Sequence, residues 1–357
     1  METGFEMDVE EITRLAGEVG RPVRFMEVCG THTMAAFRSG LRSLLPANVS
    51  LLSGPGCPVC VTPNEYIDRA IAIARQPETL VTTFGDMVRV PGTEQSLEAA
   101  RAAGAEVLVV YSPLDALNKA KSEPDKRVVF LGVGFETTAP TVAWTIREAQ
   151  QKGISNYSVL CAHKTIPPAM SALLNDGEVA VDGFMCPGHV SVIIGARAYD
   201  FICREHNTPC VVAGFEGSDM AAAIEMLLRQ MVEARAEVEI QYKRSVDMEG
   251  NVEAQATIEE VFDACDDTWR GLGVIPGSGL RIRDEFAGHD ALNEFKDLDL
   301  PVSEDEPGCI CGEILKGTRV PADCALFGKV CTPESPVGAC MVSSEGTCAA
   351  YYRYANR

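Results

Sequence analysis

The sequence has no low-complexity segment, no long apolar run and no excess of basic residues, and each absence narrows the choice of function. No apolar run reaches the length of a membrane span, and the acidic first residues contain no apolar segment typical of a secretory signal. The formal net charge is −20, from 51 acidic and 31 basic residues, which disfavours nucleic acid and anionic membrane surfaces as partners. We therefore expect a cytoplasmic protein that binds neither nucleic acid nor a membrane.

The sequence also lacks the glycine motifs that hold nucleotides. It contains no G-x-x-x-x-G-K-[ST] string, and in the string that begins at Gly132 the third glycine of G-x-G-x-x-G is replaced by Thr137. A second C-x-x-C pair, which a four-cysteine zinc site usually offers, is missing too. Nucleotide binding therefore has weak support, and a zinc site built from two such pairs is disfavoured.

Cysteine, by contrast, is abundant, with 14 residues that fall in groups. The C-terminal segment contains Cys309, Cys311, Cys324, Cys331, Cys340 and Cys348. Because the cytosol keeps thiols reduced, such groups favour metal binding or catalysis over a disulfide framework. Zinc and iron–sulfur clusters both select thiolate-rich sites, and both need only four ligands. The spacing alone therefore leaves the metal and the choice of ligands open.

Length and patterning predict an α/β protein of two or three domains. The chain has 357 residues, of which 46% are apolar and 23% charged. From about residue 22, short runs of Val, Leu, Ile and Phe alternate with loops and helical stretches, which is typical of βα units with a parallel sheet. The expected strands are 23–28, 49–53, 80–84, 107–111, 128–133, 157–161, 183–185 and 210–213. The expected helices are 33–45, 65–75, 96–103, 113–121, 139–151, 168–174, 190–203 and 219–234.

These units suggest two similar domains of four βα units each, which meet near Pro124, a residue that disfavours helix at the position before it. The expected divisions are an N-terminal extension over 1–21, α/β domains over 22–122 and 123–238, and a mixed third domain over 239–357. The third domain is expected to contain a helix over 252–264 and a turn-rich segment over 273–279. Its cysteine tail has little core of its own, so we expect a metal centre to hold it together.

Unusual residues cluster in the loops that follow the expected strands. In doubly wound α/β folds, ligands bind beyond the carboxyl ends of the strands. The loops carry Cys29, His32, Cys57, Cys60, Asp86, Arg89, Glu136, Thr137, His163, His189 and Glu216. We therefore predict that two sheet edges face one cleft, which these residues line.

Two of these features have both a reactive and an inert interpretation. Cys29 precedes a predicted helix, where the partial positive charge favours a thiolate, and His32 could act as its base; alternatively, Cys29 is a buried, inert cysteine. The pair Cys57-Pro-Val-Cys60 has the spacing of a redox dithiol, with a proline that stiffens the turn. Half of a zinc site and unbonded thiols are the alternatives for that pair.

Taken together, the loops resemble one family, HypD, the iron–sulfur maturation factor of [NiFe]-hydrogenases. The matching strings run in order from about residue 21 to the C-terminus. They are Phe25-Met-Glu-Val-Cys-Gly-Thr-His32, Gly54-Pro-Gly-Cys-Pro-Val-Cys60, Thr83-Phe-Gly-Asp-Met-Val-Arg-Val-Pro-Gly92, Gly134-Phe-Glu-Thr-Thr-Ala-Pro140, Pro187-Gly-His-Val-Ser191, Ala213-Gly-Phe-Glu216, Trp269-Arg-Gly-Leu-Gly-Val274 and Met341-Val-Ser-Ser-Glu-Gly-Thr-Cys-Ala-Ala-Tyr351.

The resemblance implies a role for each thiol group. The essential N-terminal cysteine of the family falls on Cys29, and its redox-active disulfide falls on Cys57 and Cys60. The ligands of its [4Fe–4S] cluster fall on Cys311, Cys324, Cys331 and Cys348. Cys309 and Cys340 are then extra thiols, and either could replace a neighbouring ligand.

The resemblance also implies what the protein does. Members of the family hold an iron(II) ion together with a small HypC-type partner while two cyanides and one carbon monoxide are attached. A HypE-type partner donates each cyano group from a thiocyanate, and the Fe(CN)2CO unit then passes to the hydrogenase large subunit. Cys29 would supply one thiolate to the iron, and the tail cluster would supply electrons through Cys57 and Cys60.

Two other functions use the same residues. A [4Fe–4S]-dependent thiol–disulfide oxidoreductase needs the tail and the Cys57–Cys60 pair but assigns no role to Cys29. A binding protein with a zinc-stapled tail needs neither iron nor electrons. Because the product of the first function is a metal centre that is handed on, the chain is best described as an assembly factor with redox activity, and whether it is an enzyme stays open.

Overall fold

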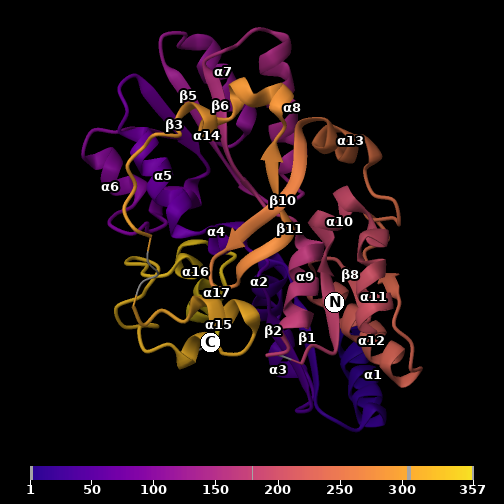
Figure 1. Ribbon diagram of the computed structural model, residues 1–357. Coiled ribbons are helices and arrows are strands. Elements are labelled where there is room, and N and C mark those ends of the chain that lie inside the picture. Colours follow the sequence, from indigo (N-terminus) through magenta and orange to yellow (C-terminus); the bar gives the residue numbers. More distant parts are fainter. Residues whose placement is uncertain (1–2, 179, 304–306, 356–357) are drawn as a thin grey trace.

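The computed structural model describes residues 3–178, 180–303 and 307–355, and its fold is α/β with two parallel sheets (Figure 1). Sheet A has the strand order β2 (Val49–Ser53), β1 (Val23–Glu27), β7 (Gly183–Pro187), β8 (Cys210–Ala213) and β9 (Val238–Ile240). Sheet B has the order β4 (Glu106–Val109), β3 (Thr79–Thr83), β5 (Arg127–Gly134) and β6 (Tyr157–His163). All neighbouring strands in both sheets are parallel. The predicted α/β class with parallel sheets and all eight predicted strands are confirmed, with strand ends that differ by at most a few residues.

The grouping of the strands differs from the prediction. The chain builds β1 and β2 of sheet A, crosses to form all of sheet B, and returns to sheet A with β7. The two sheets therefore do not correspond to residues 22–122 and 123–238, and the prediction of two sets of four consecutive units is wrong. Local patterning identifies strands, but the choice of partner strand depends on tertiary packing, which the pattern does not encode.

The strands of both sheets consist mainly of apolar residues, which suits strands that are buried on both faces. Every residue of β3, β7 and β8 is buried, and β5 is buried from Val128 to Gly134. Phe25, Phe130 and Phe184 are fully buried within these sheets. Burial of one such side chain stabilises the fold by about 1.5–3 kcal/mol. Continuous apolar runs of this kind are typical of parallel strands, which explains why sequence patterning found them.

The helices confirm the predicted pattern, with two exceptions that glycine explains. The predicted helix 33–45 is divided into α2 and α3 at Gly40, where φ is 72°. The predicted helix 190–203 is divided into α10, the 3-10 helix η2 and α11 near Gly195, where φ is 76°. Both are left-handed values of φ that glycine adopts without strain.

The helices up to residue 122 are α1 (Thr3–Val19), α2 (Gly30–Arg38), α3 (Leu41–Leu44), α4 (Pro58–Val61), α5 (Asn64–Ala74), η1 (Gly85–Arg89), α6 (Leu97–Ala102) and α7 (Pro113–Ser122). Those of the middle part are α8 (Ala139–Gln151), α9 (Ile166–Asp176), α10 (Gly188–Ile194), η2 (Ala196–Tyr199), α11 (Asp200–His206) and α12 (Gly217–Val232). Helix α1 lies in the predicted N-terminal extension and packs on α12, where Ile12, Leu15 and Ala16 are buried.

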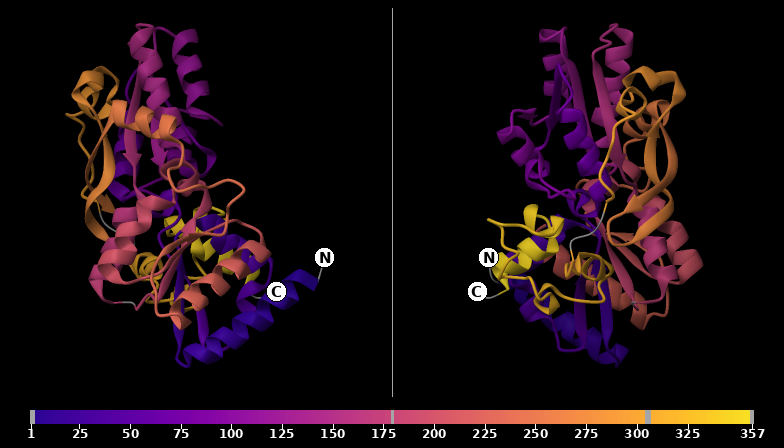
Figure 2. Two further views of the ribbon diagram at one scale, coloured as in Figure 1. Left: turned by 90° about the vertical axis from the view of Figure 1, so that its right-hand side faces the viewer. Right: turned by 60° about the vertical axis from the view of Figure 1, so that its left-hand side comes forward.

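The region after residue 239 divides into a hairpin and a tail that pack on different parts of the molecule (Figure 2). Helix α13 (Val252–Val261) ends earlier than predicted, because β10 (Phe262–Trp269) begins directly after it. The segment predicted to be turn-rich is instead part of β11 (Gly273–Ile282), which pairs antiparallel with β10. This hairpin packs against β6 and α9, and after it come η3 (Asp284–His289) and α14 (Ala291–Glu294).

The tail packs on the other side, near sheet A. It contains α15 (Cys311–Lys316), η4 (Pro321–Asp323), α16 (Ala339–Val342) and α17 (Thr347–Tyr354). Helix α17 contacts α2, α16 contacts α4, and α15 contacts β2. Phe37 of α2 meets the ring of Tyr351 edge-on, at a centroid distance of 4.7 Å. Within the described part of the chain, no helix combines the length and apolar character needed to cross a membrane.

Candidate functional site

A cleft of about 470 Å³ opens where the carboxyl ends of the two sheets meet. Its walls come from the loops after β1, β2 and β7 of sheet A and after β3, β4 and β5 of sheet B. Of the residues predicted to form the site, Cys29, Asp86, Thr137 and His189 line this cleft. The prediction that two sheet edges face one cleft is therefore confirmed.

Cys29 lies at the base of the cleft as the N-cap residue of α2, and 8% of its surface is exposed. Burial raises the pKa of its thiol to about 11, although the backbone N–H groups of His32 and Thr31 favour the thiolate. The nearby carboxylate of Glu345 also disfavours the thiolate. Of the two interpretations of Cys29, this environment favours the buried, protonated thiol in the absence of a metal ion, because desolvation exceeds the effect of the helix N-terminus. A metal ion would supply the missing positive charge and deprotonate a coordinating thiol.

His32 holds the loop after β8 through its buried ring. Its ring is fully buried, and Nε2 lies 3.0 Å from the carbonyl oxygen of Gly214 and 3.2 Å from that of Ala213, to which it donates. Burial lowers the pKa of His32 to about 4, so the ring is neutral near pH 7. The ring also stacks on Phe215, whose centroid is 4.8 Å away, and Phe215 stacks on His189 at 4.0 Å. His32 thus fixes the loop after β8 and the position of His189.

Most residues that line the cleft were not predicted from the sequence, and two of these are Glu345 and Tyr111. Glu345, from the tail, lines the cleft and accepts a hydrogen bond of 2.7 Å from the hydroxyl of Thr31. The tail passes so close to α2 here that a methyl group on Gly30 would lie 2.5 Å from Cβ of Glu345. Tyr111, in the loop that follows β4, stands at the rim with 93% of its surface exposed. Neither residue has a local signal, because Glu345 reaches the cleft only through the packing of α17 on α2.

Besides His32, Cys57 and Cys60, four predicted residues do not line the cleft. Arg89 donates to the carbonyl oxygen of Pro333 in the tail, and Glu216 begins α12 as its N-cap residue. His163 is fully buried, and burial lowers its pKa to about 3. Glu136 is also buried and accepts a 2.8 Å hydrogen bond from the backbone N–H of Ile166. These side chains follow strands, as cleft residues do, but they turn into the protein or toward the tail.

Glu136 has a measurable consequence for stability. Burial raises its pKa from 4.5 to about 7, so the folded protein binds a proton here that the unfolded chain has lost. The resulting stabilisation is fully present below pH 4.5 and is lost as the pH rises to about 7, a change of about 3 kcal/mol. In Glu136→Gln this loss is absent, so the variant gains about 3 kcal/mol relative to the parent between pH 4 and pH 8. Urea unfolding at both pH values measures the difference, and parallel pH profiles would contradict it.

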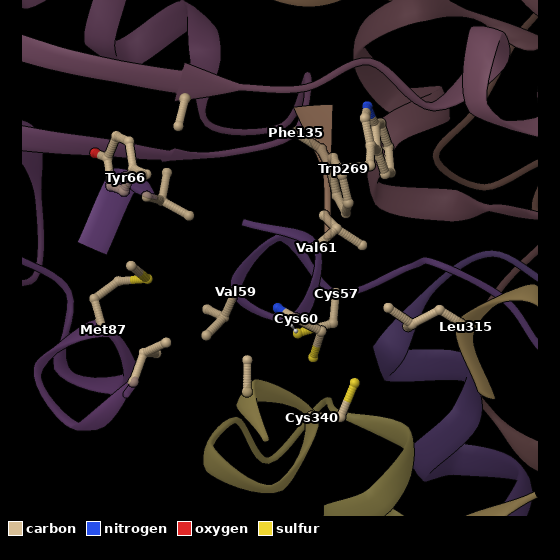
Figure 3. Close-up of a cluster of buried hydrophobic side chains, with 14 of the residues drawn as sticks. Cys57, Val59, Cys60, Val61, Tyr66, Met87, Phe135, Trp269, Leu315 and Cys340 are labelled. Atoms are coloured by element: carbon tan, nitrogen blue, oxygen red, sulfur yellow. Dashed lines mark hydrogen bonds between the residues drawn. The ribbon is translucent and has the colours of Figure 1, made fainter. Parts of the chain in front are cut away.

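The thiols of Cys57 and Cys60 are buried at the start of α4, directly above the tail (Figure 3). The backbone N–H of Cys60 lies 3.3 Å from the sulfur of Cys57. This is the tight turn of a Cys-x-x-Cys motif, which brings the two thiols close together. Figure 3 shows the side chain of Cys340 pointing toward this pair, and its thiol interacts with that of Cys60. Cys340 in turn lies 2.8 Å, sulfur to sulfur, from Cys311. Four thiols thus form a continuous chain from α4 into the tail.

The cysteines of the tail surround one small cavity, and none of the residues that line it is a carboxylate or an imidazole. Its volume is about 10 Å³, and all six tail cysteines line it. Burial and the neighbouring thiols of Cys311, Cys324 and Cys331 raise the pKa of Cys309 to about 12. Within residues 3–178, 180–303 and 307–355, no three Cys, His, Asp or Glu side chains already stand in the geometry of a metal site. The donor set fits a thiolate-bound metal centre, and the loops would have to part to admit one.

The chain was compared with known families and proteins. A family model described as HypD, the hydrogenase formation hypA family, matches residues 5–355. The chain belongs to the HypD family. A hydrogenase maturation factor HypD of Rhodobacter capsulatus is 48% identical over 352 residues, which cover 96% of this chain and 93% of that protein. The Escherichia coli K12 member is 46% identical over 346 residues, with 97% and 92% covered. The Cupriavidus necator member is 47% identical over 361 residues, with 97% and 95% covered. The role of hydrogenase maturation factor thus follows from membership of the family.

Proposed function

We propose that this HypD family member is the scaffold on which the Fe(CN)2CO group of a [NiFe]-hydrogenase is assembled, in the cytoplasm, with Cys29 as one ligand of the iron. The observation that carries the proposal is the position of Cys29. It lies at the base of a cleft of about 470 Å³, while a chain of thiols reaches from the tail to the neighbouring loop. In this proposal, the sulfur that would bind the iron and the thiols that would supply electrons lie in adjacent loops of one protein.

Cys29 suits an iron ion with cyanide and carbon monoxide ligands. Low-spin iron(II) with such ligands favours soft thiolate donors. The thiol is shielded from water, and its pKa of about 11 keeps it protonated until a metal displaces the proton. His189 and Thr31 surround the place that the iron would take, and the carboxylate of Glu345 could accept the released proton.

The proposed partners are those that the resemblance to the family implies, and the single cysteine among the described residues of the cleft is compatible with them. Cys29 is the cysteine that lines the cleft, so a second thiolate on the iron would come from a HypC-type partner that closes over the opening. The exposed ring of Tyr111 at the rim offers that partner an apolar contact. A HypE-type partner would bring the thiocyanate to the same opening, and the hydrogenase large subunit would receive the product from the complex.

The transfer of cyanide requires two electrons. Cleavage of a thiocyanate, R–S–C≡N, into a thiol and hydrogen cyanide takes up two electrons and two protons. Two cysteine thiols that join in a disulfide release the same two electrons and two protons, so Cys57 and Cys60 balance one transfer. The Cys57–Cys60 disulfide would then be reduced in two exchanges: the thiolate of Cys340 attacks the sulfur of Cys60 and releases Cys57, and Cys311 next attacks the sulfur of Cys340 and releases Cys60. Cys311 and Cys340 are then joined in a second disulfide, which electrons from the proposed tail cluster would reduce.

The contact between Cys311 and Cys340 changes the proposed ligand set of the tail. A cysteine that exchanges disulfides cannot at the same time be a cluster ligand, which leaves Cys309 as the fourth ligand in place of Cys311. The proposed ligands of the [4Fe–4S] cluster are therefore Cys309, Cys324, Cys331 and Cys348, whose thiols line one cavity. Such a cluster, when bound, supplies electrons one at a time.

The two ligand sets predict different metal contents. Purified without oxygen, Cys309→Ala should lose the cluster, because three remaining ligands hold it poorly, whereas Cys311→Ala should keep it. Iron and acid-labile sulfide analysis checks this, with about four of each per chain expected for the parent and for Cys311→Ala. The reverse result would restore Cys311 as a ligand, and one zinc per chain in the parent would replace the cluster by a structural zinc site.

The infrared spectrum of the chain purified with its small partner tests the function as a whole. Cyanide and carbonyl stretching bands are expected from the complex after expression in cells that make a [NiFe]-hydrogenase. A complex that contains the tail cluster but shows no such bands would favour the alternative, a [4Fe–4S]-dependent thiol–disulfide oxidoreductase. The continuous chain of thiols supports that alternative equally well, and only the iron at Cys29 separates the two functions.

A further inference from the structure

The string Trp269-Arg-Gly-Leu-Gly-Val274 joins β10 to β11, and the proposed function gives it no role. Within it, Trp269 is fully buried and stacks on Phe135 at a centroid distance of 5.9 Å. The next residue, Arg270, is only 8% exposed. A guanidinium group stays charged at every pH that proteins tolerate, so Arg270 is a permanent positive charge inside the protein.

Neutral groups hold this charge in place. The backbone N–H of Arg270 donates to the carbonyl oxygen of Val61, and its Nε donates to that of Thr62, both at 2.8 Å. One terminal nitrogen donates to the side-chain oxygen of Asn64, whereas Nη2 is buried with no hydrogen-bond partner. Arg270 takes part in none of the ion pairs formed by the described residues. A buried charge without a counter-charge is costly, so an anion is expected close to it.

The cysteine thiolates of the tail lie close enough to Arg270 to supply that negative charge. Arg270 lines a pocket of about 50 Å³ together with Cys309 and Cys311. The backbones of Gly271 and Gly312 touch there, such that a methyl group on Gly312 would lie 2.7 Å from Cα of Gly271. This glycine contact holds Arg270 beside the segment of the tail that carries Cys309 and Cys311. Arg270 is also hydrogen-bonded to Val61 and Thr62, the two residues that follow Cys60. It therefore connects the loop of the Cys57–Cys60 pair with the tail segment of Cys311.

We propose that Arg270 is the buried counter-charge of the tail cluster and that it raises the cluster's reduction potential. The proposal rests on the proposed function, because it requires a cluster bound by the tail cysteines. A [4Fe–4S] cluster with four thiolates is an anion, and it becomes more negative when it takes up an electron. A fixed positive charge in the low-dielectric interior therefore stabilises the reduced form more than the oxidised form.

Redox titration of the anaerobically purified holoprotein, followed by electron paramagnetic resonance, tests the proposal. Arg270→Met removes the charge, and we expect the ratio of reduced to oxidised cluster at a fixed potential to fall at least about tenfold, which equals about 59 mV. Arg270→Lys keeps the charge and should restore most of this ratio. The matched control is Arg319→Met in the same tail, where the side chain is 58% exposed and solvent screens the charge, so the ratio should not change.

A second variant tests the charge without removing the arginine. Asn64→Asp places a carboxylate on the oxygen that already accepts from Arg270, and it should lower the ratio as Arg270→Met does, even if Arg270→Met does not fold. Unchanged potentials in Arg270→Met or, should that variant not fold, in Asn64→Asp would overturn the proposal. An Arg270→Lys potential as low as that of Arg270→Met would overturn it too, since packing and not charge would then be responsible. A parent protein without iron and sulfide would instead refute the proposed function itself.

Discussion

Replacement of Cys29 by alanine is expected to abolish the cyanide and carbonyl infrared bands of the complex with the proposed small partner, whereas the brown colour of the proposed tail cluster should be retained. The reason is that Cys29 supplies the sulfur through which the proposed function holds the iron, and no other cysteine lines the cleft among the described residues. The loss is expected to be complete, because the remaining polar groups of the cleft, including His189 and Thr31, are poor substitutes for a soft thiolate.

The matched control for this experiment is Cys265→Ala, which removes a partly buried cysteine from β10, away from the cleft. It should leave both the infrared bands and the colour unchanged. Bands of normal intensity in Cys29→Ala would remove Cys29 from the account. Loss of the colour together with the bands would point to general unfolding, which a circular dichroism spectrum of the same sample would show.

The second large effect is expected from Cys340→Ser, which breaks the chain of thiols between the tail and Cys60. An oxygen atom cannot exchange with a disulfide, so electrons that enter at the tail no longer reach the Cys57–Cys60 pair. The cluster should survive, because Cys340 is not among its proposed ligands. Dithionite is added to the oxidised holoprotein, and differential alkylation with mass spectrometry then counts the free thiols at Cys57 and Cys60. Both are expected to be free in the parent and neither in the variant.

The matched control here is Cys203→Ser on α11, a cysteine that is also buried but lies outside the chain of thiols. It should behave as the parent does. A small phosphine reductant should free Cys57 and Cys60 in all three proteins, which shows that the pair itself is intact. If dithionite reduces the pair in Cys340→Ser at the rate of the parent, the path through Cys340 does not exist.

Much of the fold could be predicted from the sequence, because buried parallel strands are continuous apolar runs. Strands such as Val49–Ser53 and Cys210–Ala213 have the ends that the pattern indicates. The order of the strands could not be predicted, since the exchange of β7 into sheet A is decided by packing over long distances. The hairpin of β10 and β11 was missed because its glycine and proline residues, such as Pro276, are typical of turns.

The site was predictable to the extent that it follows strand ends. Cys29, Asp86, Thr137 and His189 reach the cleft because the carboxyl ends of parallel strands meet at one edge. Glu345 was missed because it reaches the cleft through the tail. The choice between the two interpretations of Cys29 could not be made from the sequence, since burial cannot be seen in a sequence and here outweighs the helix N-terminus.

Anomalous scattering at the iron absorption edge, from crystals of the chain in complex with its small partner, tests the central claim most directly. The account predicts a single-iron peak within bonding distance of the sulfur of Cys29, separate from a stronger peak at the tail. A crystal in which the single iron lies elsewhere, with the sulfur of Cys29 bound to nothing, would contradict it.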